Sequence, residues 1–486
     1  MRKSRGLGIL PLSLCVLTWA AGCSHAIFPT QGGGGGGGSN VPVILTFHDT
    51  APAGISVTSF EVTVTGAVMQ PGSVSLLSAP QTIELTQLQA NSAFLSTTQV
   101  ATGSYTSLAI TYANPKYTFL NDSGVQVTAN GQTCAAGASC VVTPTITGAS
   151  TVTLSGAAPF PIVTTTNQTT LLGVDLDLSS AVQSDFSVSF ANSTSAAAVQ
   201  STGATGATVG NFAVTGAVKS VGSNQFNLTS STGQMLTVAV SSSTAFQFQR
   251  ANCTANDFTC VAVGQILNVD MSNLTTTGDL QANEVDFDDA AATQQVTGTI
   301  VSFNATPPTS FQMIMHNAVP SISGFSVGTP VTVNIANTAT FAVNNGSLPL
   351  PGGVTFATPS DLLVGQEVEA RVSGTFTAGP PASFTTDRIA LEPTQITATV
   401  TSVNPGNLSF ILDNLSLLFT QAPSGAVLQI QVLTASQTLF LTPNGSFNDI
   451  VIATSPNNVF SVGGFLFNTI GSTGSPTIVA GTVVGP

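Results

Sequence analysis

Three segments of eight residues decide the fold: VTGAVKSV at 214–221, VTGTIVSF at 296–303 and ITATVTSV at 396–403. Each is rich in valine, isoleucine and threonine, whose branched side chains are typical of β-strands. Because nearly the same segment occurs three times in one chain, the sequence predicts an internal repeat.

Other landmarks follow each of these segments in a fixed order. A strand with a phenylalanine comes first, then a threonine followed closely by a phenylalanine, and later a Val-Gly-x turn. The strand phenylalanines are Phe226, Phe311 and Phe410; the second landmarks lie at 244–246, 340–341 and 438–440; the turns lie at 263–265, 364–366 and, with a weaker match, 462–464. The first two copies end with strands near Val285 and Ile389. The shared order predicts three related units, each of five or six short strands.

The order of strands in these units resembles domain of unknown function 5666, whose members look like small barrels of the OB type. Such barrels are built from five strands in a Greek-key arrangement. The resemblance implies three small OB-like β-barrel repeats, at 212–292, 293–393 and 394–486. The third copy departs most from the pattern.

The region at 41–197 is predicted to be a β-sandwich. Its residues alternate with a period of two at 57–68, 82–88 and 103–110, as expected for strands with one buried face. A glycine before Tyr105 suits a sandwich corner, where the phenol caps backbone groups. The stretch at 198–211 is rich in Gly, Ala, Thr and Ser and predicts a linker to the repeats.

Four features of this region suggest a family. The Asp-x-Ala-Pro turn at 49–52, the Ile-Glu-Leu segment at 83–85, the Gly-x-Tyr-Thr strand at 103–106 and the Asp-Leu-Asp-Leu segment at 175–178 resemble domain of unknown function 4382. That family is an immunoglobulin-like or prealbumin-like sandwich common in bacterial lipoproteins. The resemblance covers about a third of the chain and implies no catalytic residues. With the repeats, it implies an all-β protein.

The N-terminus predicts export. Basic residues within 1–5, an apolar stretch at 7–19 and small residues before Cys23 are the parts of a signal peptide, predicted at 1–22. The Ala-Ala-Gly-Cys end resembles a bacterial lipobox, which implies lipidation of Cys23, although Ala20 stands where the family usually has leucine. Cleavage after the Ser-His-Ala at 24–26, giving a secreted protein, is the alternative.

A glycine-rich tether is predicted at 23–40. The unbroken glycine run at 32–38 forms neither a core nor stable secondary structure, and the tether reaches about 25 Å as a flexible coil. In some lipoproteins an aspartate directly after the lipidated cysteine resembles a signal for retention in the inner membrane. This chain has Ser24 at that position. We therefore expect the protein to bind the outer membrane through its lipid anchor. A second partner, an envelope or extracellular ligand, is expected but its identity is unknown.

Composition excludes a nucleic-acid partner. The chain has a formal net charge of −13, and charged residues make up only 6% of it. After the signal, the basic residues are Lys116, Lys219, Arg250, Arg371 and Arg388. They form no cluster along the sequence, whereas binding to nucleic acid requires clustered Lys and Arg to neutralise phosphates.

Four cysteines follow Cys23, as two close pairs. Cys134 and Cys140 bracket one short polar stretch, and Cys253 and Cys260 bracket another. Small loops closed by disulfides are expected in an oxidising compartment. A metal site would need CxxC-type spacing and supporting histidines, and neither occurs nearby. We predict two disulfides, one in each pair.

The sequence offers little for catalysis. The histidines are His25 in the tether, His48 at a strand end and His316 in a strand of the second copy, and there is no Gly-x-Ser-x-Gly elbow. His48 adjoins Asp49, but adjacent strand residues point to opposite faces, so a turn-forming role is preferred for Asp49. No catalytic residue and no cofactor are predicted.

Acidic residues at one strand are the best polar site in the sequence. Glu284, Asp286 and Asp288 share one strand face and are candidate ligands of Ca²⁺. Because they lie in a line about 7 Å apart without a glycine-turned ligand loop, a solvated strand face is preferred. Asp175 and Asp177 have the same geometry and receive the same interpretation.

The expected function is that of a non-enzymatic, lipid-anchored envelope protein that displays β-modules for binding or spacing. The first alternative is a periplasmic ligand- or Ca²⁺-binding module. A hydrolase that uses His48 or His316 is a remote alternative.

Overall fold

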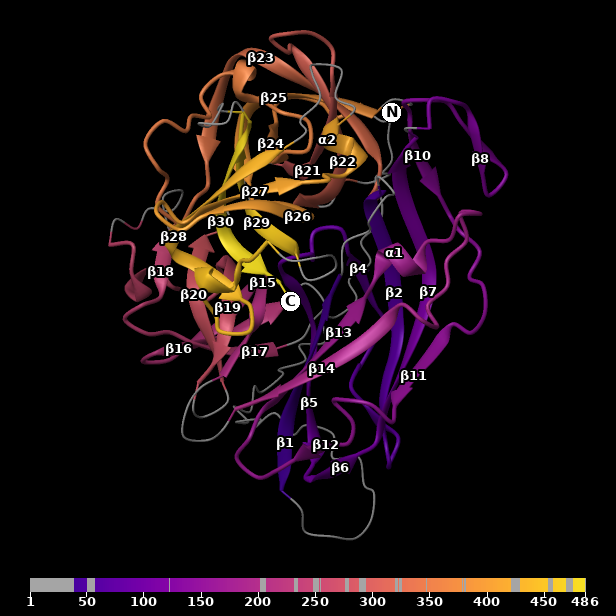
Figure 1. Cartoon of the computed structure of the whole chain (residues 1–486). Helices are drawn as coiled ribbons and strands as arrows, with labels where there is room; N and C mark the ends of the chain where they lie inside the picture. Colours follow the sequence, from indigo (N-terminus) through magenta and orange to yellow (C-terminus); the bar gives the residue numbers. More distant parts are fainter. Residues whose placement is uncertain are drawn as a thin grey trace, which may run out of the picture. The chain divides into compact units, whose positions relative to one another are not determined.

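A computed structural model describes most of the chain beyond the N-terminal segment. It covers residues 39–49, 57–121, 123–201, 207–230, 235–247, 253, 255–275, 279–287, 294–319, 322, 326–346, 348–377, 379, 382–420, 429–452, 458–468 and 475–485. Cys23, most of the predicted tether, and Asp288 lie outside these residues. Nearly all of the regular secondary structure of the described chain is β-strand, which confirms the predicted fold class (Figure 1). No helix in the described part is long and apolar enough to cross a membrane.

Two sheets form the N-terminal sandwich. One contains β14 (Thr194–Gln200), β13 (Thr170–Leu176), β1 (Asn40–His48) and β5 (Ser92–Ala101), in that order; the other contains β10 (Ser139–Val142), β7 (Ser107–Leu120), β2 (Val57–Gln70) and β3 (Val74–Ser75), with β11 (Thr151–Ser155) on β7 and β4 (Gln81–Glu84) on β2. The smaller elements are β6 (Gly103–Tyr105) paired with β12 (Ile162–Thr164), β8 (Val127–Ala129) paired with β9 (Gln132–Cys134), and the one-turn helix α1 (Leu178–Ala181).

Apolar side chains from both sheets meet in one core. Strand β2 alternates buried and less buried positions, so that Phe60, Val62 and Val64 face inward. The ring of Tyr112 stacks on Phe190 with centroids 4.3 Å apart. Alternation with a period of two is what places one side of each strand in the core.

The predicted tyrosine corner is confirmed. The hydroxyl of Tyr105 donates a hydrogen bond to the backbone carbonyl of Ala101 at 2.9 Å. This bond satisfies a carbonyl at the turn between β5 and β6, the role that such a tyrosine has in sandwich folds.

Three small barrels follow the sandwich. The first barrel contains β15 (Ala207–Val221), β16 (Gln225–Ser230), β17 (Met235–Ala239), β18 (Ala245–Gln247), β19 (Ile266–Leu274) and β20 (Leu280–Phe287). The second contains β21 (Gln295–Phe303), β22 (Ser310–Val319), β23 (Pro330–Val343), β24 (Glu367–Val372) and β25 (Ala382–Glu392). The third contains β26 (Thr394–Asn404), β27 (Ser409–Asp413), β28 (Ile430–Leu441), β29 (Val459–Phe467) and β30 (Thr477–Val484), with the one-turn helix α2 (Leu417–Thr420). A short 3-10 helix occurs in each, at Phe258–Cys260, Pro359–Asp361 and Phe447–Asp449.

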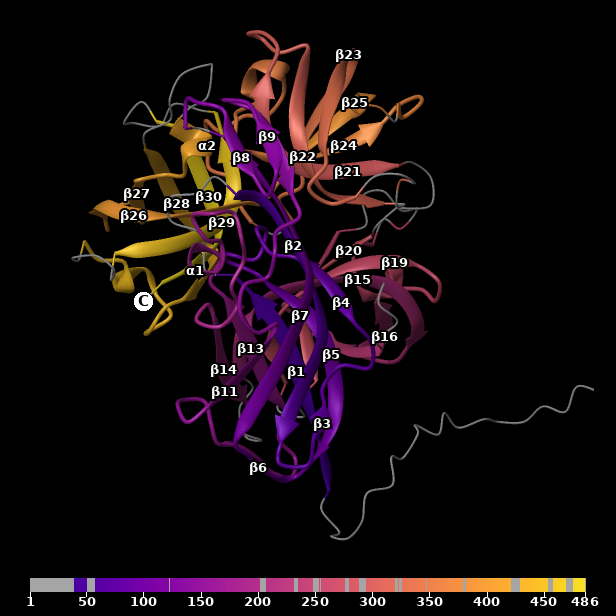
Figure 2. The same ribbon diagram turned by 90° about the vertical axis from the view of Figure 1, so that its right-hand side faces the viewer.

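The same order of pairing closes all three barrels. In the second barrel, β21 pairs with β22, β22 with β23, β23 with β25 in parallel, β25 with β24, and β24 with β21 (Figure 2). The third barrel repeats this order with β26 to β30. In the first, β15, β16, β17, β20 and β19 close the ring, and β18 extends it along β20. A closed five-stranded Greek-key barrel is the architecture of the OB fold, so the predicted OB-like repeats are confirmed.

The predicted linker is shorter than the sequence suggested. Strand β14 continues to Gln200, and β15 begins at Ala207. β14 forms a regular antiparallel ladder with β13, because backbone hydrogen bonds require no large side chains. Further along β15, Phe212 and Ala213 pair in parallel with β5, so the first barrel extends a sheet of the sandwich.

The Val-Gly-Gln turn has the same role in the first two barrels. Gly264 and Gly365 have φ angles of +90° and +91°, a region that favours glycine. In both barrels the side-chain oxygen of the next residue, Gln265 or Gln366, accepts the backbone N–H three residues before it, at 2.6 Å. The motif is therefore repeated because it builds one closed turn.

The third barrel builds this turn differently, and the predicted match at 462–464 is wrong. Those residues lie within β29. The backbone carbonyl of Asn458 accepts the N–H of Val400 at 2.8 Å, just as the carbonyl of Gln366 accepts the N–H of Ile300 at 2.9 Å. Asn458 therefore takes the position of the glutamine. A Val-Gly dipeptide also fits a strand, so it does not locate the turn by itself.

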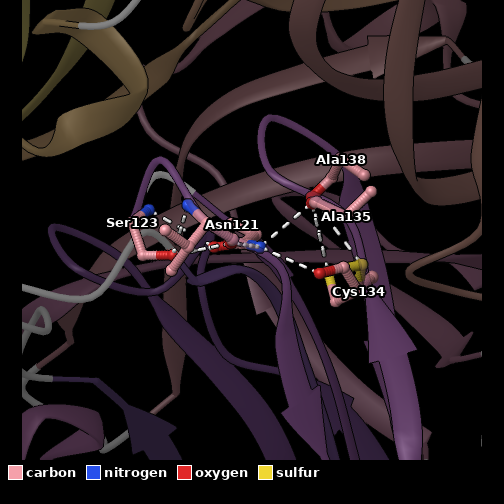
Figure 3. Close-up of a disulfide and its surroundings, with 7 residues drawn as sticks. Asn121, Ser123, Cys134, Ala135 and Ala138 are labelled. Atoms are coloured by element: carbon pink, nitrogen blue, oxygen red, sulfur yellow. Dashed lines mark hydrogen bonds between the residues drawn. A yellow bond between two sulfur atoms is a disulfide. The ribbon is translucent and has the colours of Figure 1, made fainter.

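Both predicted disulfides are confirmed. Cys134 is bonded to Cys140, and Cys253 is bonded to Cys260. Figure 3 shows the first of them beside Asn121, whose side-chain N–H groups donate to the carbonyls of Val125, Cys134 and Ala135 at 2.8 to 3.0 Å. The amide and the disulfide therefore fix the same loop from two sides.

Candidate functional site

A cavity of about 940 Å³ is lined by residues from the sandwich and from all three barrels. Its acidic residues are Glu84 from β4, Asp270 from β19, Glu284 and Asp286 from β20, Glu367 and Glu369 from β24, and Glu392 from β25. Its basic residues are Lys219 and His316. The remaining lining residues are mostly amides, hydroxyls and small apolar side chains, and no Phe, Tyr or Trp is among the described ones. We call this the acidic cavity.

Three carboxylates lie close together on the wall formed by the first barrel. Asp270 is paired with Glu284 across β19 and β20, and Asn268 is paired with Asp286 in the same ladder. The pKa of Asp270 is raised to about 7, mainly by burial and in addition by the negative charges of Glu284 and Asp286. Like charges are therefore crowded at this wall.

The strand face with Glu284 and Asp286, which was predicted to be solvated, is partly covered by another module. Both side chains are half-buried and line the acidic cavity. The side-chain amide of Asn344 donates to Asp286 Oδ2 at 3.4 Å, and Glu284 lies so close to Gly346 that a Cβ there would come within 2.1 Å of its carboxylate. A turn of the second barrel thus covers this strand, an arrangement that depends on contacts between modules rather than on local sequence.

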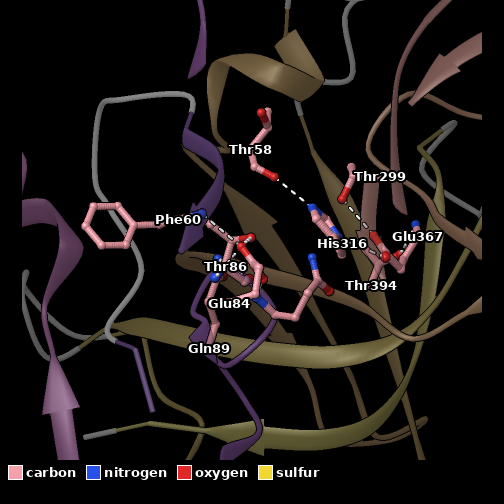
Figure 4. A network of polar contacts seen from close by, with 10 residues as sticks. Thr58, Phe60, Glu84, Thr86, Gln89, Thr299, His316, Glu367 and Thr394 are labelled. Atoms are coloured by element: carbon pink, nitrogen blue, oxygen red, sulfur yellow. Dashed lines mark hydrogen bonds and ion pairs between the residues drawn. The ribbon is translucent and has the colours of Figure 1, made fainter. Parts of the chain in front are cut away.

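A buried histidine connects the sandwich to the second barrel (Figure 4). Nδ1 of His316 lies 2.9 Å from Oε1 of Glu367, and Nε2 lies 2.8 Å from the backbone carbonyl of Thr58. Both partners are acceptors, so both ring nitrogens must donate, which requires the imidazolium. Burial alone lowers the pKa of His316, but the charge and hydrogen bond of Glu367 outweigh it and raise the pKa to about 9.

The geometry of His316 does not suit a general base. A base needs a free lone pair within reach of the proton that it accepts. Glu367 itself receives a further hydrogen bond from the Thr299 hydroxyl at 2.7 Å, so the carboxylate is held by two donors. The arrangement is that of a buried ion pair within the second barrel, whose histidine also donates to the sandwich.

Glu84 organises the loop that reaches the third barrel. Its Oε1 accepts hydrogen bonds from the backbone N–H of Phe60 at 2.8 Å and from the hydroxyl of Thr86 at 2.7 Å (Figure 4). Further along this loop, the N–H of Ala90 donates to Oε1 of Gln395 at 3.0 Å. One carboxylate of the cavity thus also positions a contact between modules.

Polar contacts outside the lining of the cavity also join the modules. Lys116 of the sandwich donates to the carbonyl of Val327 at 2.6 Å, and the hydroxyl of Thr118 donates to the carbonyl of Gly328 at 2.7 Å. Between the second and third barrels, the side-chain amide of Gln366 donates to the carbonyl of Leu466 at 2.7 Å. The modules are therefore packed together.

The second histidine candidate pairs with an acid other than its neighbour. Nδ1 of His48 lies 3.2 Å from Oδ1 of Asp175, its partner across the β1–β13 ladder. Asp49 points elsewhere: it is buried and accepts the backbone N–H of Leu178 at 3.3 Å. Burial raises the pKa of Asp49 well above its usual value. The carboxyl of Asp49 thus contacts α1, a distant segment of the sequence. Its predicted turn role stays a prediction, because residues 50–56 lie outside the described part of the chain.

The prediction of a solvated strand face is wrong for Asp177. Strand β13 ends at Leu176, and Asp177 is the N-cap of α1. Its carboxylate accepts the backbone N–H of Ser179 at 2.9 Å, as N-cap residues do.

No compact metal centre occurs among the described residues. In that part of the chain, no group of three or more His, Cys, Asp or Glu side chains has a geometry that holds a metal ion. Because Asp288 lies outside it, the structure does not test the alternative of a Ca²⁺ site at Glu284, Asp286 and Asp288, which the sequence suggests but does not favour.

Sequence reasoning missed most residues of the acidic cavity. Asp270 alternates with the buried residues Val269 and Met271, and Glu367 and Glu369 alternate with Val368 in β24. This alternation was a usable signal for polar strand faces. It gives no information on which faces of different modules lie opposite each other.

Comparisons with known proteins do not identify the family of this chain. No family model matches the chain, and no curated protein matches it. A solved structure titled "drosophila Unr CSD456" is similar at 11% sequence identity, with a TM-score of 0.12; the match covers 56% of this chain and 97% of that one. A TM-score of this size supports no argument about fold or function. The class of the protein, one sandwich followed by three five-stranded barrels, rests on its own strand pairing.

Proposed function

We propose that this chain is a non-enzymatic binding protein of the bacterial envelope, held at the outer membrane by a lipid on Cys23. The observation that carries the binding role is the acidic cavity of about 940 Å³, to which four β-modules contribute. Cavities of this size are typical of sites for small molecules. The occupied ring nitrogens of His316 favour binding over acid–base chemistry.

Three features support a place in the envelope. The N-terminal residues have the order of a signal peptide that ends in a lipobox-like Ala-Ala-Gly-Cys. The glycine run at 32–38 provides a tether between an anchored Cys23 and the first strand at Asn40. The two disulfides are typical of an oxidising compartment. Free secretion after cleavage at 24–26 is the alternative.

The anchor is tested by fractionation of cells that express the full chain. We expect the parent protein to sediment with the membrane and the Cys23→Ser variant to move to the soluble fraction, because the variant has no thiol to acylate. Cys15→Ser, inside the signal peptide, is the matched control and should stay with the membrane. A Cys23→Ser variant that fractionates like the parent would favour free secretion or another mode of attachment.

A further inference from the structure

We propose that the acidic cavity binds a small, flexible polycation: a linear oligoamine whose protonated nitrogens are separated by methylene groups. The inference rests on the proposed function, because it names the ligand class of the same cavity. The number, distribution and surroundings of the carboxylates support it.

The first step concerns the sign of the net charge on the cavity lining. Seven carboxylates line the cavity, against the basic groups Lys219 and His316. The charge of His316 is already matched by Glu367 at 2.9 Å, and Arg388 approaches Glu369 at 3.2 Å. The described lining therefore has a negative excess, which attracts cations and repels anions.

The second step concerns the spread of the charge. The carboxylates come from β4, β19, β20, β24 and β25, around a cavity of about 940 Å³. Among the described residues, no three of them gather closely enough to hold one metal ion. A ligand that distributes several charges along its length matches this lining better than a single compact ion.

The third step concerns hydrogen bonding and apolar contact. Ammonium groups are donors only, and carboxylates and amide oxygens are acceptors. Amide side chains such as Asn268 and Asn317 lie among the carboxylates, and Ala213, Ile266 and Pro393 provide apolar surface for methylene groups. No Phe, Tyr or Trp is among the described lining residues, and the ring of His316 is buried in its ion pair, so stacking on a sugar ring or a base is not provided.

Crowding at the wall of the first barrel supports the same ligand class. Asp270 lies opposite Glu284, and its pKa is raised by burial and by its acidic neighbours. An ammonium group placed there would relieve the repulsion between these carboxylates.

The probe that tests the proposal is spermine, titrated calorimetrically into the full-length mature chain carrying Cys23→Ser. We expect saturable binding at one site, whereas butylamine, with a single amine, should show none under the same conditions. The Asp270→Asn/Glu284→Gln variant should bind spermine at least about tenfold more weakly. The matched control is Asp413→Asn, because Asp413 contacts Gln429 and does not line the cavity.

Substitution of Lys219 tests the direction of the change in spermine affinity without altering a core residue. Its side chain is exposed and lines the acidic cavity, so Lys219→Gln should leave the fold intact. Because the substitution removes a positive charge beside the ligand, spermine should bind more tightly, by about three- to tenfold. A structural role alone would not produce tighter binding.

Three results with spermine would overturn the proposal. They are no saturable binding of spermine up to about 1 mM, equal weakening by Asp413→Asn, or unchanged affinity in Lys219→Gln. Saturable binding of Ca²⁺ alone, lost in the Asp270→Asn/Glu284→Gln variant, would also replace the oligoamine by a metal ion. If spermine does not bind while Cys23→Ser still releases the protein from the membrane, the ligand class is wrong and the envelope role stands.

Discussion

Replacing Gly298 with alanine is expected to destabilise the protein by about 3 kcal/mol, although it adds only one methyl group. A Cβ at this position would lie 2.1 Å from the backbone carbonyl oxygen of Ile314 on the neighbouring strand. A backbone carbonyl within a sheet cannot rotate away as the end of a long side chain can. Strands β21 and β22 would therefore have to separate, which breaks hydrogen bonds in the ladder.

The repeat supplies a matched control for this substitution. The third segment has Ala398 where the first two have Gly216 and Gly298. The ladder between β26 and β27 begins only at Thr399, so the close approach is absent there. Ala398→Gly should cost about 1 kcal/mol, as glycine does in a strand. Chemical denaturation measures both variants, and equal stability of Gly298→Ala and the parent would contradict the strand spacing described here.

Replacing His316 with alanine is expected to cost about 3 to 5 kcal/mol of unfolding free energy. The substitution leaves the carboxylate of Glu367, which is 3% exposed, without its cationic partner, and it removes the donor to the carbonyl of Thr58. A charge left alone in a buried site is far more costly than a pair. His48→Ala is the control: His48 is partly exposed beside Asp175, and its loss should cost less than about 1 kcal/mol.

The same ion pair predicts how stability depends on pH. The pKa of His316 rises from 6.5 in the unfolded chain to about 9 in the folded protein. A raised pKa stabilises the folded state fully below pH 6.5, and this contribution is lost as the pH rises to 9. The loss amounts to about 3 kcal/mol. Denaturation of the parent should show this decline, and an identical decline in His316→Ala would assign it to other groups.

The barrels could be predicted because their signals are local. The three similar strand segments, the phenylalanines that follow them and the Val-Gly-Gln turns can each be recognised from a few neighbouring residues. The turn of the third barrel was not located from the sequence, because Asn458 makes the backbone contact of Gln366 but is not preceded by Val-Gly. The linker was overestimated because small residues pair in a ladder as well as large ones.

The acidic cavity could not be predicted for the opposite reason. His316 contacts Glu367, which is 51 residues away, and Thr58, which is 258 residues away. Asp286 receives the amide of Asn344 from another barrel, at a separation of 58 residues. Periodicity assigns each of these residues to a strand face, but only the packing of modules brings the faces together. The same packing changes a strand face expected to be solvated into the wall of a cavity.

The most direct measurement on the envelope role is the mass of the N-terminal peptide of the mature protein, isolated from the membrane fraction of its host. The proposed function predicts a chain that begins at Cys23 and has the added mass of a diacylglyceryl group and an amide-linked acyl chain on that residue. An unmodified N-terminus at Ile27, after cleavage behind Ala26, would contradict it and make the protein a secreted one.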